Sequence, residues 1–205
     1  MITSSPFIII SISSDEVKMR KLIGSKIAEH IVLVDALGKG KIPEQIESIA
    51  KKIRAALKNG NKILFCGNGG SAADSQHLAA EFVGRFQKER NGLPAIALTV
   101  DTSILTAVGN DYGFEKVFAR QVDALGNKGD VLIGFSTSGN SKNVLLAVAL
   151  AKEKGLFTVG FTSNSGGQMA KECDINVNVP TKVTARAQEM HILLGHILCE
   201  LVDGE

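Results

Sequence analysis

Two stretches near the N-terminus carry apolar residues at helical spacing. Residues 15–37 are predicted to form one helix and residues 43–59 a second, with Pro43 at its first helical position. The apolar residues of the second helix recur every three or four positions, so they lie on one face, which is expected to be buried. They are Ile46, Ile49, Ile53 and Leu57.

The pattern changes after residue 60, where short apolar runs alternate with helical segments. Strands that are nearly continuous apolar runs, each followed by a helix, are typical of a parallel sheet covered on both faces. The expected fold is an α/β three-layer sandwich around a five-stranded parallel sheet with flavodoxin-like strand order. The five runs are residues 62–66, 95–99, 131–135, 157–161 and 175–179.

The last predicted helix, residues 184–203, is apolar around most of its circumference. Such a helix needs more than one packing partner. It is therefore either central in the fold or in contact with another subunit, and the two N-terminal helices raise the same question. Because the chain has the length of a single domain, we interpret residues 15–205 as one domain and residues 1–14 as a weakly ordered extension.

The composition argues against several classes of partner. The formal net charge is only +2 and there is no basic run, so a nucleic-acid interface is not expected. No apolar run is long enough to span a bilayer, and the apolar patch at residues 7–12 lacks the basic flank and cleavage site of a signal peptide. Cys66, Cys173 and Cys199 are far apart in apolar contexts, which indicates reduced core residues of a cytoplasmic protein.

A glycine-rich turn, Gly67-Asn68-Gly69-Gly70-Ser71, lies between the first predicted strand and the next helix. Backbone N–H groups at a helix N-terminus, together with the helix dipole, attract an anion. Glycines at such a position also serve the turn alone, so this loop leaves both interpretations open.

A second loop, STSGNS at residues 136–141, favours the anion. It follows the third predicted strand, precedes a helix and offers four hydroxyl groups, those of Ser136, Thr137, Ser138 and Ser141. A helix N-cap needs only one hydroxyl, so the other three indicate phosphate binding through uncharged donors. In a flavodoxin-like sheet the first and third strands are neighbours where the strand order reverses, so both loops are expected to line one crevice.

Two nucleotide-binding interpretations compete for the first loop. Gly67-x-Gly69-x-x-Ala72 fits the dinucleotide fingerprint, but the acidic residue that should follow about 20 positions later is Asp101, 34 residues after Gly67. The fingerprint also gives no role to STSGNS. A Walker-type loop is excluded because the sequence contains no GxxxxGK[ST].

Four motifs, CGNGGSAADSQH, VGNDYGF, STSGNS and RAQEMHILLGHIL, are similar to those of the sugar isomerase (SIS) fold and, within it, of the phosphoheptose isomerases. The resemblance runs from about residue 20 to the end of the chain, with the motifs in the family's order and spacing. It implies an enzyme that interconverts sedoheptulose 7-phosphate and D-glycero-D-manno-heptose 7-phosphate, the first step towards the heptose of lipopolysaccharide and related glycans. It also implies a homotetramer with sites at subunit boundaries.

The resemblance further assigns residues by position. It implies a zinc ion held by His77, Glu81, Gln188 and His196, with Glu81 and His196 as the acid/base pair. The residues that it implies contact the sugar phosphate are Asn68, Gly69, Gly70, Asn110, Asp111, Ser136, Thr137, Ser138, Ser141 and Gln188.

The chemistry of a ketose–aldose isomerisation requires residues of these types. A carbon-bound proton must be removed and a proton returned to the adjacent carbon, which two groups that exchange protons near neutral pH can do. A histidine and a partly desolvated carboxylate have suitable pKa values, and the sequence leaves open which acts first. His77 and Glu81, at i and i+4, share a helix face and can reach one ion; the ordinary alternative is a solvated His–Glu pair.

Gln188 and His196 are eight residues apart on the last predicted helix, about 12 Å along its axis. For both to bind one ion, the helix must be irregular, the residues must come from two chains, or the ion must lie between long side chains. Nitrogen and oxygen ligands suit zinc and other divalent metals, so the choice of zinc depends on the resemblance. His30 and His191 are predicted to be packed or surface residues and not ligands.

Two other functions would use the same phosphate-binding loops. Replication-initiation regulators of the same superfamily bind the bacterial initiator protein without catalysis and depart from the pattern at the positions of Glu81 and His196, both of which this chain has. A sugar-phosphate sensor would need the loops but not the acid/base pair. The sequence therefore favours a metal-dependent isomerase, while the exact sugar is left open.

Overall fold

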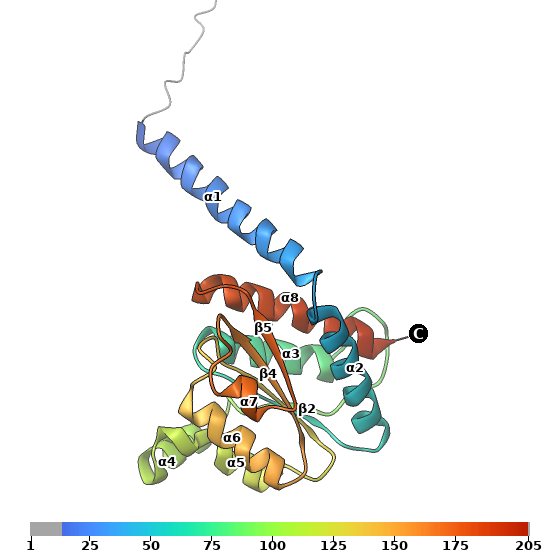
Figure 1. Ribbon diagram of the computed structural model, residues 1–205. Helices are drawn as coiled ribbons and strands as arrows, with labels where there is room; N and C mark the ends of the chain where they lie inside the picture. The colour runs from blue at the N-terminus through green and yellow to red at the C-terminus, as the bar shows by residue number, and fades with distance from the viewer. Residues whose placement is uncertain (1–13, 205) are drawn as a thin grey trace, which may run out of the picture.

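The computed structural model describes residues 14–204 (Figure 1). The N-terminal extension predicted for residues 1–14 lies outside the described residues except for Ser14, where α1 (Ser14–Leu37) begins. With α2 (Ile42–Lys58), α1 confirms the two predicted N-terminal helices to within one residue at each end.

The sheet has the predicted architecture. Its five strands are all parallel and their order is β2-β1-β3-β4-β5, which confirms the flavodoxin-like arrangement. β1 and β3 are neighbours, with Phe65 opposite Ile133 and Cys66 opposite Gly134, although β2 separates them in the sequence. The strands are β1 (Ile63–Cys66), β2 (Ala95–Ala97), β3 (Val131–Phe135), β4 (Phe157–Ser163) and β5 (Ile175–Val179).

Helices cover both faces of this sheet, so the sandwich has three layers (Figure 1). Alternate strand residues point to opposite layers, which is why Ile63 and Phe65 pack with one helix layer while Leu64 and Cys66 pack with the other. The first layer consists of α2, α3 (Gly70–Val83) and α8 (Thr184–Asp203). The second consists of α4 (Thr102–Tyr112), the short 3-10 helix η1 (Phe114–Lys116), α5 (Val117–Leu125), α6 (Lys142–Glu153) and α7 (Met169–Glu172).

Helix α8 has the predicted bounds and occupies a central position. It packs against α2, α3 and the last two strands, which accounts for apolar residues on several of its faces. Of the two alternatives for this helix, a place inside the fold is confirmed, while Ile197 and Leu201 remain 38% exposed.

Helix α1 differs from α8. Leu37 is the only buried residue of α1, whose residues 14–37 are all described by the structure. Figure 1 shows it projecting beyond the globular body. Apolar residues on it are more than half exposed; they are Met19, Leu22, Ile23, Ile27, Ile31 and Val32.

The described residues contain no helix long and apolar enough to cross a membrane. Cys66 and Cys199 are buried and Cys173 is half-buried, and all three are free thiols, as expected.

Candidate active site

The first glycine-rich loop closes tightly between β1 and α3. Gly69 has a φ of 56° and occupies the N-cap of α3, a conformation that side chains other than glycine rarely adopt. A Cβ at Gly67 would lie only 2.6 Å from the carbonyl oxygen of Ser71, so a larger residue does not fit. The turn therefore brings backbone groups to the N-terminus of α3, where the helix dipole favours an anion.

The second loop gathers its hydroxyl groups at the N-terminus of α6. The Oγ atoms of Ser136 and Ser141 are 2.8 Å apart, and the Oγ of Ser138 lies 3.4 Å from that of Ser136. Ser141 occupies the N-cap position, yet within the described chain its side chain makes no capping hydrogen bond. Capping therefore does not explain these hydroxyl groups.

The second loop also packs against the end of β4 and the turn that follows it. The Ser163 hydroxyl donates to the carbonyl oxygen of Thr137 at 2.8 Å. Gly139 has a φ of +67°, and a Cβ there would lie 2.0 Å from the carbonyl oxygen of Gly166. Only glycine permits this approach, which fixes the loop before any ligand binds.

The two loops face each other at the β1/β3 switch point, as predicted. A cavity of about 530 Å³ lies between them. Residues from both loops, from η1 and from the first turn of α6 line it; they are Asn68, Gly69, Phe114, Glu115, Ser141, Lys142 and Asn143.

Asn143 is a site residue that the sequence did not reveal. Its buried side chain exchanges two hydrogen bonds with Asn68, since each amide nitrogen donates to the other's oxygen, at 2.8 and 2.9 Å. This pair of amides joins the first loop to the N-terminal end of α6, next to the second loop. Lys142 was also missed, although it directly follows the hydroxyl-rich motif and places a cation at the cavity.

Asn110 and Asp111 lie at the exposed end of α4, where the Asn110 amide donates to the Asp111 carboxylate at 2.8 Å. They do not line the cavity between the loops, whereas the adjoining η1 does. Their contact with a sugar phosphate stays a prediction. Asp101, the acidic residue of the rejected dinucleotide fingerprint, instead caps α4 by accepting a hydrogen bond from the backbone N–H of Ile104 at 2.9 Å.

Three of the four predicted metal ligands lie together. The ligand atoms of His77, Glu81 and His196 all fall within 4.8 Å of one another. The Nε2 atoms of the two histidines are 2.9 Å apart, and the Nε2 of His77 is 3.2 Å from a Glu81 carboxylate oxygen. Glu81 and His196 are half-buried and His77 is exposed, so the cluster opens to the surface.

The donor set fits a divalent cation. Two imidazole nitrogens that face each other at 2.9 Å must share a proton or a positive ion, because otherwise two lone pairs would meet. A nearby carboxylate supplies the negative charge that a divalent ion requires, and this mixture of nitrogen and oxygen ligands suits zinc among other metals.

The cluster forms within one chain because α3 and α8 run parallel. Gly70 contacts Gln188 near their first turns, and Leu78 contacts Gly195 further along, so His196 comes beside His77. The structure thus needs no second chain to bring Glu81 and His196 together.

Gln188 lies at the other end of this helix pair. A Cβ at Gly70 would be 2.5 Å from its Oε1, so the amide rests on the first turn of α3. Gly70 precedes His77 by seven residues, about 10 Å along the helix axis. Metal binding by Gln188 stays a prediction, and its position over the first loop also suits a ligand of that loop.

Asp74, one turn before His77 on α3, was not predicted to be perturbed. Burial raises the pKa of its carboxyl group to about 6, against a smaller lowering effect of His77. Its Oδ2 is buried and has no hydrogen-bond partner among the described residues. The carboxyl group thus titrates closer to neutrality than an ordinary aspartate.

The remaining histidines are packed or on the surface, as predicted. His191 is buried beside the rings of Phe135 and Phe161, and its Nε2 donates to the carbonyl oxygen of Thr162 at 3.0 Å. Burial lowers its pKa to about 4. His30 pairs with Glu189 at 2.9 Å on the surface of α1 and α8.

Comparison with known proteins agrees with this fold. Residues 36–163 match the family described as SIS domain. The phosphoheptose isomerase of Aliarcobacter butzleri is 59% identical over 162 residues, which cover 79% of this chain and 86% of the relative. That of Clostridium acetobutylicum is 52% identical over 188 residues, covering 91% and 96% of the two chains. The structure of a phosphoheptose isomerase from Neisseria gonorrhoeae superimposes with a TM-score of 0.85 at 45% identity, covering 91% of this chain and all of the other. This chain therefore belongs to the phosphoheptose isomerases of the SIS domain family.

Proposed function

We propose that this protein converts sedoheptulose 7-phosphate into D-glycero-D-manno-heptose 7-phosphate through an enediol. The observation that carries the proposal is the arrangement along α3. The phosphate-type loop lies at its N-terminus, and the proton-exchanging cluster begins at His77, about 10 Å further along the axis. Such a separation suits an extended seven-carbon sugar that has its phosphate at C7 and its reacting carbons, C1 and C2, at the other end.

The two loops would hold the phosphate through hydroxyl and backbone N–H groups. Ser136, Ser138 and Ser141 already lie within hydrogen-bonding reach of one another, so little rearrangement is needed to bind an anion. Glu81 and His196 would form the acid/base pair. One removes the proton from the carbon beside the carbonyl group and returns it to the adjacent carbon, and the other moves the proton between the two oxygens.

His77, Glu81 and His196 would hold the metal, which we propose is zinc. A bound divalent ion would polarise the two substrate oxygens that exchange the proton and would stabilise negative charge on them. The family pattern adds Gln188 as a fourth ligand, and for this role its amide would have to turn from Gly70 towards the cluster.

The assembly that we propose is a homotetramer in the cytoplasm. The apolar side chains of α1 are exposed to solvent, and a contiguous apolar surface of that kind is usually covered by another protein surface. Closed symmetry is the usual way to cover it. The free thiols of Cys66, Cys173 and Cys199 are consistent with a reducing compartment.

The two competing functions, binding of the replication initiator and sugar-phosphate sensing, give no role to the Glu81 and His196 side chains. The ligand atoms of Glu81 and His196 lie within 4.8 Å of each other, and Glu81 is on the helix that starts at the phosphate loop, which favours catalysis.

The test is to incubate the purified protein with sedoheptulose 7-phosphate, with and without added zinc, and to follow the aldose product by ¹³C NMR. Fructose 6-phosphate and ribulose 5-phosphate serve as shorter comparison sugars. Product from the heptose at a kcat/KM at least about tenfold above that for the shorter sugars supports the proposal. Absence of any aldose product from the zinc-loaded protein refutes it.

A further inference from the structure

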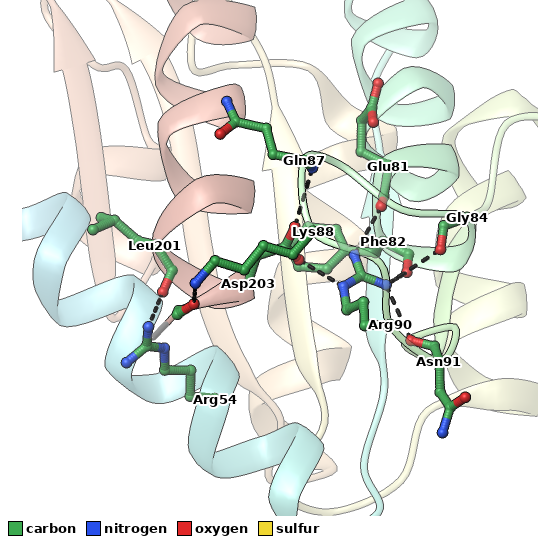
Figure 2. Close-up of polar contacts among 11 residues, drawn as sticks. Arg54, Glu81, Phe82, Gly84, Gln87, Lys88, Arg90, Asn91, Leu201 and Asp203 are labelled. Carbon is green, nitrogen blue, oxygen red and sulfur yellow. Dashed lines mark hydrogen bonds and ion pairs between the residues drawn. The ribbon is translucent and has the colours of Figure 1, made fainter.

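The loop between α3 and β2, residues 84–94, contains no helix or strand, but it binds the C-terminal ends of α3 and α8. We call it the strap. Figure 2 shows Arg90 of the strap between the end of α3 and Asp203 of α8. The Arg90 Nε donates to the Asp203 carboxylate at 2.6 Å, while its Nη atoms donate to the backbone carbonyls of Glu81 at 3.0 Å and Phe82 at 2.9 Å. One guanidinium group therefore joins the C-terminal ends of both helices that carry the cluster.

Electrostatics explains why cations gather here. Because α3 and α8 run parallel, the partial negative charges of their two C-termini lie side by side, and positive side chains offset them. Besides Arg90, Lys88 of the strap binds the carbonyl oxygen of Gly204, and Arg54 of α2 binds that of Leu201 (Figure 2).

The Arg90–Asp203 pair is largely shielded from water. The Arg90 side chain is 16% exposed and that of Asp203 is 3% exposed. Breaking such a pair by removing one partner leaves the other charge buried without compensation, which is strongly destabilising. The ion pair thus fixes the strap to the end of α8, and breaking it should lower the stability of the folded protein.

The strap also touches His196 directly. The ring of Phe86 stacks on the His196 imidazole, with centroids 5.5 Å apart and planes inclined by 25°. From another side His77 meets the same imidazole edge-on, at 5.0 Å and 68°. The orientation of the His196 ring, and hence the direction of its Nε2, is therefore set between Phe86 and His77.

We propose, on the basis of the function assigned above to Glu81 and His196, that Phe86 and Arg90 are positioning residues for the isomerisation. Phe86 fixes the plane of the His196 ring, and Arg90 fixes the last turn of α3, where Glu81 stands, against α8. Glu81 is eleven residues beyond Gly70, about 16 Å along α3 from the phosphate loop. Loss of the Phe86 or Arg90 contacts should therefore lower kcat and leave KM nearly unchanged, because the phosphate is bound at the other end of α3.

The main variant is Phe86→Leu, which keeps an apolar side chain but removes the ring. We expect kcat to fall by about ten- to a hundredfold, the scale of a small misplacement of a reacting group, with KM within about twofold. Phe86→Tyr keeps the stacking ring and should retain the wild-type kcat. Glu89→Gln, an exposed change in the same strap, is the matched control and should alter nothing.

Two further measurements do not depend on turnover. Zinc affinity, measured by competition with a chelator, should fall in Phe86→Leu and be retained in Phe86→Tyr. The chain has only 4 histidines, so the ¹³Cε1 signal of His196 can be assigned by comparison with His196→Asn. In the metal-free protein this signal should move in Phe86→Leu, because the ring above it has been removed.

The outcomes separate the strap from the proposed function. A wild-type protein that makes no aldose refutes the proposed function, and the zinc and NMR comparisons then still decide on the strap. If the wild type is active and Phe86→Leu keeps the wild-type kcat, zinc affinity and His196 signal, the positioning role of the strap is refuted while the proposed function stands. The same conclusion follows if Phe86→Leu changes only KM. If Phe86→Leu does not fold, Arg90→Lys is the second test. Lysine keeps the positive charge but cannot donate to Asp203 and to the two α3 carbonyls at once, so kcat should fall equally at unchanged KM. A wild-type kcat in Arg90→Lys overturns the proposal.

Discussion

The buried His191 should make the protein sensitive to acid in a way that one substitution removes. Its Nε2 must carry the proton, because it donates to the carbonyl oxygen of Thr162. Its Nδ1 is buried without a hydrogen-bond partner among the described residues. A second proton at Nδ1 would place an uncompensated charge beside Phe135 and Phe161, so the folded state resists protonation.

The size of the effect follows from the two pKa values. Burial lowers the pKa of His191 from 6.5 to about 4, so between these values the unfolded chain binds more protons than the folded one. This contribution to stability is fully present above pH 6.5 and is lost as the pH falls towards 4. At pH 5 the loss is about 2 kcal/mol, and its full extent is about 3 kcal/mol.

The assay is urea unfolding of the wild type and of His191→Gln at pH 7.5 and pH 5, at one protein concentration. Glutamine can donate to Thr162 but does not titrate, so the stability difference between the two proteins should shrink by about 2 kcal/mol on acidification. The comparison with the variant is needed because Asp74, whose pKa is raised to about 6, makes an opposite contribution over part of this range. Equal losses of stability in both proteins would refute the reasoning.

Four further predictions concern the site and the assembly. Glu81→Gln and His196→Asn should each lower kcat at least about a hundredfold with little change in circular dichroism, and turnover near that of the wild type would remove the residue from the mechanism. Because both residues lie in one chain, mixed oligomers of these two variants should recover no activity; recovery would place them on different chains. Ser138→Ala with Ser141→Ala should mainly raise KM, and inorganic phosphate should compete with the substrate; unchanged affinity by calorimetry would contradict this. Light scattering should show a tetramer, and Ile27→Glu with Ile31→Glu on exposed α1 should dissociate it, whereas a monomeric wild type would exclude the assembly.

The fold was largely predictable because its signals are local. Strands β3 and β5 and helix α8 have the predicted bounds, since each is an apolar pattern that is followed by a polar residue, a proline or a glycine. The hydroxyl-rich loop was also recognisable, because four hydroxyls in six residues exceed what a cap requires.

The rest depends on contacts between segments distant in the sequence. Asn143 meets Asn68 only because β1 and β3 are neighbours, and no pattern around either residue indicates a pair. The approach of His196 to His77 depends on the register of α3 against α8, which periodicity does not determine. Phe86 and Arg90 stand in a loop without any repeat, so only the folded chain shows what they touch.

The contact between Gly195 and Leu78 has a consequence for the evolution of this family. These residues precede His196 and follow His77 directly, and a Cβ at Gly195 would lie 2.6 Å from a Leu78 methyl group. A side chain added at position 195 would require the buried Leu78 side chain to move or to be smaller. The two positions should therefore vary together in active relatives, so that a larger residue at one is accompanied by a smaller residue at the other.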